Sequence, residues 1–337
     1  MIDTGEDTDF RNVPSLNAHS SGVGIVWSDR DSSFGGSSDS DIVFRYDSGN
    51  GWSAPELVSE HYYEADSEIP VLASAGDWLY MLYRDGGDLD QEENSNGNDA
   101  HGDDGDIFFR RSSNNAESWS DPVVVSRING DGDSNGGTIG YQYRSAIAAV
   151  DSYVYAAWVD YNLLDADDYY DYEIMFAISP DYGSSWGEPF ILSSSYGDAL
   201  SYEPVIVAEG SHVYVAWRDW GNVDGSGTDY DINFRHSDDY GQNWDDTIVP
   251  YDNDITDYYP ALALGGDRVH LAFLEYGSID EQNILSLWSS DYGDSWTEPI
   301  IVNNEDESNN YADYPVLAAD SDTLYVAWTD NGNYDGD

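Results

Sequence analysis

The chain has 337 residues, with 67 acidic and 11 basic side chains and a formal net charge of −56. A surface this negative argues against nucleic acid as a partner, and the absence of cysteine excludes disulfides and thiol catalysis. Aromatic residues make up 15% of the chain and recur periodically, which is the opposite of the pattern in disordered proteins.

All basic residues are arginine, and the acidic residues are spread over the whole chain. Self-repulsion on this scale opposes compaction in dilute buffer, but at about 1 M salt the Debye length falls to roughly 3 Å. The composition therefore predicts a protein of an extreme halophile. No stretch has the length and apolarity of a membrane span, so we expect no membrane insertion. We expect an extracellular or cell-surface location; the first residues are no signal peptide and would fit either a mature chain with an added Met or a cytoplasmic start.

The chain repeats one unit of four short predicted strands, termed a, b, c and d. Strand a is apolar and often led by proline, strand b is aliphatic and ends in an aromatic residue, strand c reads Asp-Ile-x-Phe-Arg, and strand d follows Glu/Asp-Pro. In chain order the units span about residues 10–59, 65–126, 143–193, 201–250, 257–302 and, with strands a and b alone, 313–337. Repetition of this kind predicts the blades of a β-propeller, which stack on one another to bury their faces.

The sixth unit lacks its c and d strands, and residues 1–9 hold no copy that could complete it. We therefore expect either a fragment of a longer chain or a last blade of two strands, and we favour the fragment. The fold class predicted is all-β: a six-bladed propeller of four-stranded antiparallel blades forming a single domain over 1–337, with an incomplete last blade. Aromatic residues at the end of strand b, such as Trp158 and Trp217, are interpreted as core packing.

An eight-residue turn recurs between strands c and d. Complete copies lie at 179–186 and 289–296, a near copy at 237–244, and two worn copies at 112–119 and 46–52. In each complete copy Asp can accept backbone hydrogen bonds, Gly supplies a left-handed conformation, and Trp can fold back over the hairpin.

This Ser-x-Asp-x-Gly-x-Ser/Thr-Trp pattern resembles the Asp-box (BNR) repeat of sialidases and other β-propellers. The resemblance implies that the box lies on the c–d turn, away from the ligand face, and that its Asp residues are structural. It also implies that the ligand face is built by the d–a and b–c loops. Function must be argued from those loops, because the fold hosts unrelated activities.

Arginines at the expected ligand face give the clearest candidate site. Sialidases carry a Phe/Tyr-Arg-Ile-Pro motif whose Arg binds the substrate carboxylate; Arg11 lies in a similar stretch with one residue inserted, and Arg144 in one with Ala in place of Pro. Arg84 and Arg218 end strand b of their units. We hypothesise that Arg84, Arg144 and Arg218 converge on an anionic ligand, because guanidinium groups bind carboxylates bidentately. The alternative is that each pairs with an adjacent aspartate, since Asp85 and Asp219 follow two of them.

Other candidate residues are fewer. Trp220, just past strand b of the fourth unit, is placed to stack on a sugar ring. Asp131, Asp133 and Asn135 alternate as oxygen ligands at the start of a Ca²⁺ loop, so bound Ca²⁺ or Na⁺ is expected, although a solvated acidic turn would have the same sequence. Tyr202-Glu203 could serve a sialidase-like mechanism, but tyrosine and acidic residues are so frequent that no catalytic residue is assigned.

The function predicted is a non-catalytic recognition module that binds glycans or cell-surface proteins through the d–a/b–c loop face. A sialidase-like exo-glycosidase that uses the arginines is the first alternative. A structural component of a larger cell-surface or virion protein is the second, suggested by the incomplete sixth unit.

Overall fold

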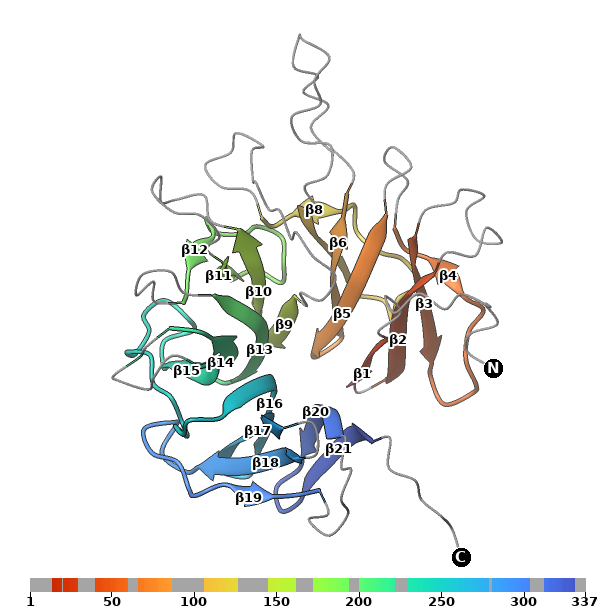
Figure 1. Ribbon diagram of the computed structural model, residues 1–337. Helices are drawn as coiled ribbons and strands as arrows, with labels where there is room; N and C mark the ends of the chain where they lie inside the picture. The colour runs from red at the N-terminus through yellow and green to blue at the C-terminus, as the bar shows by residue number, and fades with distance from the viewer. Residues whose placement is uncertain are drawn as a thin grey trace, which may run out of the picture. The chain divides into compact units, whose positions relative to one another are not determined.

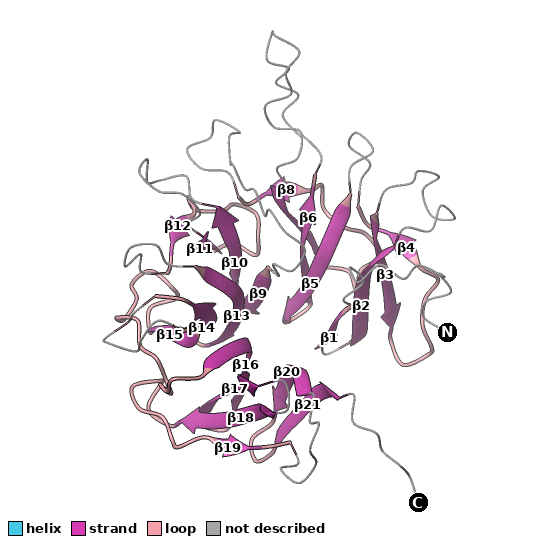
Figure 2. Ribbon diagram, in the orientation of Figure 1, coloured by secondary structure: helices cyan, strands magenta, loops and turns pink. Residues whose placement is uncertain are grey.

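The structure is a computed structural model. It describes residues 14–19, 21–29, 40–59, 66–86, 106–126, 145–161, 172–193, 200–221, 223, 229–278, 281–303 and 312–330. These residues form β-strands joined by turns and loops and contain no helix (Figures 1 and 2). Within this part of the chain, accordingly, no helix could cross a membrane. The predicted all-β class is confirmed.

The first three sheets are antiparallel and have four strands each. The first contains β1 (Ser15–His19), β2 (Gly22–Asp29), β3 (Asp41–Asp47) and β4 (Glu56–Leu57). The second contains β5 (Ser67–Ala75), β6 (Trp78–Asp85), β7 (Asp106–Ser112) and β8 (Val123–Val124). The third contains β9 (Ala146–Val150), β10 (Tyr153–Tyr161), β11 (Tyr172–Ser179) and β12 (Phe190–Ile191).

The last three sheets differ in strand number. The fourth has β13 (Ser201–Glu209), β14 (His212–Asp219) and β15 (Asp231–Ser237). The fifth has β16 (Thr256–Gly265), β17 (Arg268–Ser278), β18 (Glu281–Ser289) and β19 (Ile300–Ile301). The sixth has β20 (Ala312–Ala319) and β21 (Leu324–Asp330). The predicted a–b pairs are confirmed in all six sheets.

The chain divides into two compact units: unit 1 is residues 1–166 with 175–190, and unit 2 is residues 167–174 with 191–337. Each unit has its own apolar core. In unit 1 the buried side chains of β2, β3, β6 and β7 form one cluster around Val26, Phe44 and Met81. In unit 2 a cluster around Phe234, Leu271 and Phe273 joins β14, β15, β17 and β18.

Strand b is buried along most of its length, as expected for a strand covered on both faces. Trp158 and Trp217 are among the largest fully buried side chains, which confirms their interpretation as core residues. Trp328 of β21 is only partly buried, because its sheet has two strands.

A carboxylate latch closes strand d onto strand c in the first three sheets. The Oγ of Ser59 donates to Asp41 at 3.0 Å, that of Ser126 donates to Asp106 at 2.8 Å, and that of Ser193 donates to Glu173. The same hydroxyls accept the next backbone N–H of strand c, for example that of Ile42 at 3.0 Å. The latch therefore satisfies a buried acid and a strand end together.

The fourth sheet lacks this latch. Tyr251 stands three residues after Ile248, where the other sheets have Ser or Asn, and Pro250 has no N–H to give to the ladder. The predicted strand d is reduced to a single bridge between Phe234 and Ile248. Asp231, the acid at the start of strand c in this sheet, is 1% exposed, and Tyr251 stands where the latch serine stands in the first three sheets.

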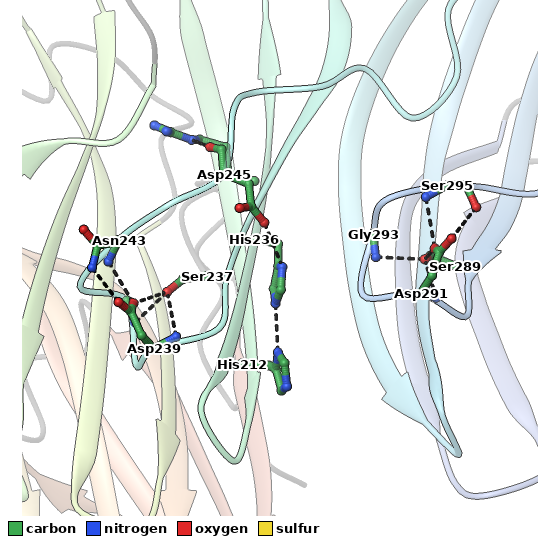
Figure 3. Close-up of polar contacts among 12 residues, drawn as sticks. His212, His236, Ser237, Asp239, Asn243, Asp245, Ser289, Asp291, Gly293 and Ser295 are labelled. Atoms are coloured by element: carbon green, nitrogen blue, oxygen red, sulfur yellow. Dashed lines mark hydrogen bonds and ion pairs between the residues drawn. The ribbon is translucent and has the colours of Figure 1, made fainter.

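The repeated turns have the hydrogen bonds expected of them (Figure 3). Asp291 accepts the Oγ of Ser289 at 2.7 Å and the N–H and Oγ of Ser295 at 3.0 and 2.6 Å. The hydrogen bond from the Ser295 hydroxyl is the main reason that the pKa of Asp291 is lowered. Gly293 has φ of 101°, and Trp296 folds back to donate to its carbonyl at 3.1 Å. These aspartates hold the turn itself.

Arginines of strand c connect neighbouring sheets within each unit. Arg110 donates through Nε to Ser120 O at 2.7 Å and through Nη1 to the carbonyl of Val58 in the first sheet. Arg235 donates in the same way to Asp245 O at 2.7 Å and to Leu192 O at 2.8 Å. The acceptors are main-chain oxygens, so these arginines act as tethers and not as ligand-binding groups.

Candidate functional site

Two of the predicted ligand arginines are already paired. The Nη1 of Arg84, at the end of β6, lies 3.5 Å from Oε2 of Glu68, and the Nε of Arg218, at the end of β14, lies 3.8 Å from Oε2 of Glu203. Their side chains are 21% and 13% exposed. Both arginines thus face glutamates of strand a, Glu68 and Glu203, and not the adjacent aspartates that the alternative named.

Arg218 is also enclosed by aromatic rings. Its guanidinium carbon lies 4.8 Å from the ring centre of Tyr202 and 4.7 Å from those of Tyr230 and Tyr258. These distances are within the range of cation–π attraction, which is strong where water is excluded. Arg218 thus organises three tyrosines from three strands or strand ends: β13, the start of β15, and β16.

The three tyrosines belong to a larger group of rings in unit 2, which we call the aromatic platform. Ring contacts run from Trp220 to Tyr230 (5.4 Å between centres), to Tyr258 (6.2 Å), to Tyr259 (5.8 Å) and to Tyr314 (4.3 Å). The remaining members touch this run: Tyr276 contacts Tyr258, Tyr202 contacts Tyr230, and Tyr172 contacts Tyr202.

The platform is unusual because several of its rings are exposed. Trp220 is 46% exposed, and Tyr276 and Tyr314 are each 37% exposed. Large apolar side chains at the surface are unremarkable singly, but a contiguous group of them marks a site of interaction. Trp220, the sequence-predicted stacking residue, is one of this group.

Carboxylates surround the platform but are themselves buried. The exposed fraction is 8% for Glu203, 2% for Asp219, 0% for Asp257, 9% for Glu275 and 8% for Asp313. Both oxygens of Asp257 lack a hydrogen-bond partner. Burial, together with the charges of Asp231, Glu275 and Asp229, raises the pKa of Asp257 well above its usual value.

Asp257 departs from the repeat at a defined position. Its Cα pairs with that of Glu275, as Ser67 pairs with Asp85 and Ser201 with Asp219. Each serine donates to the opposite acid, at 2.5 Å in the second sheet and 2.6 Å in the fourth. In the fifth sheet two acids therefore face each other where the second and fourth sheets have a donor and an acceptor.

The backbone brings the tyrosines to the platform. Glu203, Tyr259 and Tyr314 each precede a proline and have φ of 58°, 53° and 51°, at bulges where strand a shifts register against strand b. Such conformations cost about 1–3 kcal/mol and persist where surrounding contacts hold them. The x-Pro start of strand a was recognised in the sequence, but the bulge and the tyrosines it positions were not.

The remaining predicted site residues lie outside the described residues. These are Arg11, Arg144, Asp131, Asp133 and Asn135, so the arginine convergence and the Ca²⁺ or Na⁺ loop stay predictions. In the described part of the chain, no group of three or more His, Asp or Glu side chains could hold a metal ion.

A histidine chain at the other end of the fourth sheet was not anticipated from the sequence (Figure 3). His212 Nδ1 lies 2.9 Å from His236 Nε2, and His236 Nδ1 lies 3.0 Å from Oδ2 of Asp245. Tyr292, from the turn of the fifth sheet, stacks on His212 with ring centres 4.4 Å apart. Burial lowers the pKa of His236, which favours the neutral form of that imidazole near pH 7.

These features define an all-β protein of repeated antiparallel sheets with a recurring turn. Its exposed aromatic surface lies in unit 2, at strand ends away from those turns. The chain belongs to the BNR repeat-like domain family, which matches residues 26–326. No curated protein matches it in sequence.

Solved structures share the fold at low sequence identity. A Dyadobacter fermentans protein of unknown function is 15% identical, with a TM-score of 0.59 and coverage of 96% of this chain and 92% of its own. Trypanosoma rangeli sialidase in complex with the inhibitor DANA is 14% identical, with a TM-score of 0.57; 96% of this chain spans 53% of the sialidase. A PL25 ulvan lyase bound to -[GlcA(1-4)Rha3S]- is 12% identical, with a TM-score of 0.59 and coverage of 95% and 77%. The fold is therefore sialidase-like.

Proposed function

We propose that this protein is a non-catalytic glycan-recognition module, and that its six sheets are the blades of one β-propeller. The observation that carries the proposal is the aromatic platform, on which Trp220, Tyr276 and Tyr314 expose their rings. Aromatic faces with a few nearby polar groups are typical of sites that bind small organic ligands. Structural neighbours bound to an inhibitor of sialidase or to an oligosaccharide support a carbohydrate-related role.

The absence of catalysis is proposed because the described carboxyl groups beside the platform are buried. A glycosidase that uses two carboxyls needs them on either side of the glycosidic bond, within reach of it. Glu203 instead faces Arg218 and accepts the backbone N–H of Tyr259 at 3.0 Å. Burial raises the pKa of Tyr259, the tyrosine whose N–H this glutamate accepts, so the Tyr259 hydroxyl stays protonated.

Binding of immobilised neutral and acidic oligosaccharides, measured near neutral pH in molar NaCl, tests the proposal. We expect wild-type protein to bind at least one glycan without cleaving it, and Trp220→Ala to weaken that binding by about 2 kcal/mol, or roughly 30-fold. Trp52→Ala is the control, because Trp52 is also an exposed tryptophan, 36% accessible, but lies in unit 1.

Two results would overturn the proposal. Release of reducing ends or unsaturated products from a bound glycan would make the protein an enzyme. Equal loss of binding in Trp220→Ala and Trp52→Ala would show that the platform is not the binding surface.

A further inference from the structure

The charge around the aromatic platform restricts the class of glycan that can bind there. This restriction rests on the proposed function, and it concerns the sign of the ligand's charge. Trypanosoma rangeli sialidase is known in complex with sialic acid, an acidic sugar, and the arginines of this chain at first suggest the same preference. The contacts of Arg218 point the other way.

Arg218 is the one basic residue beside the platform among those that the structure describes in unit 2. Arg235 donates to main-chain carbonyls, and Arg268 lies over the ring of Trp288, 5.3 Å from its centre, where β17 begins. Arg218 itself has Glu203 at 3.8 Å and three tyrosine rings around its guanidinium. A carboxylate ligand would have to displace Glu203 from a side chain that is only 13% exposed.

The electrostatic field near the platform also opposes an anion. Asp219, Asp231, Asp257, Glu275 and Asp313 are all buried within this part of unit 2. The pKa of Asp257 is raised by burial and by its acidic neighbours, which means that one more negative charge is already unfavourable there. Charges that lie in low dielectric are screened by salt less than exposed ones, so molar salt weakens this repulsion without removing it.

What remains for recognition is the apolar face of the rings. Trp220 and Tyr314 are exposed at the two ends of a run of five contacting rings, and Tyr276 is exposed beside its middle. Such a run offers several stacking positions, which suits an oligosaccharide better than a single terminal sugar. We infer that the aromatic platform selects neutral oligosaccharides and discriminates against their carboxylate-bearing counterparts.

Matched pairs of oligosaccharides that differ in charge provide the test. We would titrate full-length protein in molar NaCl with hexagalacturonate and its full methyl ester, and with 3′-sialyllactose and lactose, beside a neutral panel of cello-, xylo- and chito-hexaose. In each pair that binds, the neutral member is expected to bind at least tenfold more tightly. Raising the salt concentration should reduce this difference in affinity, because it strengthens binding of the acidic member.

The outcomes separate the inference from the proposed function. Tighter binding of an acidic member than of its neutral match would overturn the inference and leave glycan recognition standing. Failure of every neutral and acidic probe to bind would overturn the proposed function, and the inference with it.

A variant tests the role assigned to Glu203. Glu203→Gln keeps an oxygen for the N–H of Tyr259 but removes the charge that faces Arg218, so the preference for neutral members is expected to shrink severalfold. Glu209→Gln is the matched control, since Glu209 is an exposed acid at the other end of β13 and its loss changes net charge equally. An identical preference in both variants would show that the pairing of Arg218 does not set the ligand's charge.

Discussion

Replacing Asp257 by serine is predicted to stabilise the protein near neutral pH. Asp257 is wholly buried, neither of its carboxylate oxygens has a hydrogen-bond partner, and its Cα pairs with that of another acid, Glu275. Serine is the residue that the second and fourth sheets have at this position, where its hydroxyl donates to the opposite acid at 2.5 and 2.6 Å. The substitution removes a like-charge pair and supplies a donor.

The magnitude follows from the two contacts that change. An unsatisfied buried polar group costs about 1–3 kcal/mol, and a hydrogen bond to a charged group contributes about 1.5–3 kcal/mol. Glu275 already accepts the side-chain amides of Asn253 and Asn283, at 2.7 and 3.3 Å, so only part of the second contribution is available. We therefore expect the free energy of unfolding to rise by about 1–3 kcal/mol.

The gain should depend on pH, and its sign is fixed. The pKa of Asp257 is raised in the folded state, so folding takes up a proton between the unfolded and folded pKa values. The destabilisation that Asp257 causes in the wild-type protein is absent below the pKa of Asp257 in the unfolded state. It grows as pH rises above that value and is complete above the pKa of Asp257 in the folded state. The advantage of Asp257→Ser should accordingly shrink toward about pH 4, near the unfolded value.

Urea denaturation in molar NaCl, followed by tryptophan fluorescence near pH 7 and at acidic pH, measures this difference. Ser201→Asp is the reciprocal control: it places two acids opposite each other in the fourth sheet, at Asp219, and should destabilise in the same pH range. A loss of stability in Asp257→Ser near neutral pH would refute the reasoning, because it would mean that the carboxylate is already compensated, for instance by a bound cation.

Two further predictions concern the turns and the tethers. Gly293→Ala should lower the free energy of unfolding by about 2–4 kcal/mol, because the residue has positive φ and an added Cβ would lie 2.7 Å from the Cζ of Phe234. Gly210→Ala is the control: Gly210 also has positive φ, 57°, but an added Cβ would meet open space, so the cost should be about 1 kcal/mol. Equal urea midpoints for the two variants would refute the steric contribution. Arg235→Lys should cost about 1 kcal/mol of unfolding free energy by losing one of two carbonyl contacts. Arg45→Lys should change stability little, because the one carbonyl contact of Arg45, to Ser53 O, is solvent-exposed. Thermal denaturation at fixed salt compares the two variants, and an unchanged stability of Arg235→Lys would contradict its role as a tether.

The sequence predicted the fold well because its strands carry local signals. Strand c begins with Asp and ends with Phe-Arg in several units, and the structure shows why: Asp41 and Asp106 hold the latch, Phe234 packs under the next turn, and Arg235 is a tether. The prediction of one strand was wrong. The predicted d strand of the fourth sheet is a single bridge, and Pro250 and Tyr251 are the residues in the sequence that could have indicated this.

The candidate site was predicted less completely because it depends on contacts between sheets. Trp220 could be found from its place after strand b, but the tyrosines of the platform could not be distinguished in a chain with 28 of them. Backbone bulges such as that at Tyr259 determine which tyrosines reach the platform, and no single residue type predicts such a bulge. The pairing of Arg218 with Glu203 is likewise a product of three-dimensional packing.

The arginine tethers have a consequence for how such a chain can change over evolutionary time. Arg110 and Arg235 grip main-chain oxygens, those of Val58 and Leu192, and every amino acid offers that oxygen. The contact between two sheets therefore requires an arginine on one side and only a correctly placed backbone carbonyl on the other. A repeat unit of this kind can be duplicated and inserted beside an unrelated unit without a compensating substitution in that neighbour. The repeats can therefore diverge in their loops while the contacts between sheets are kept.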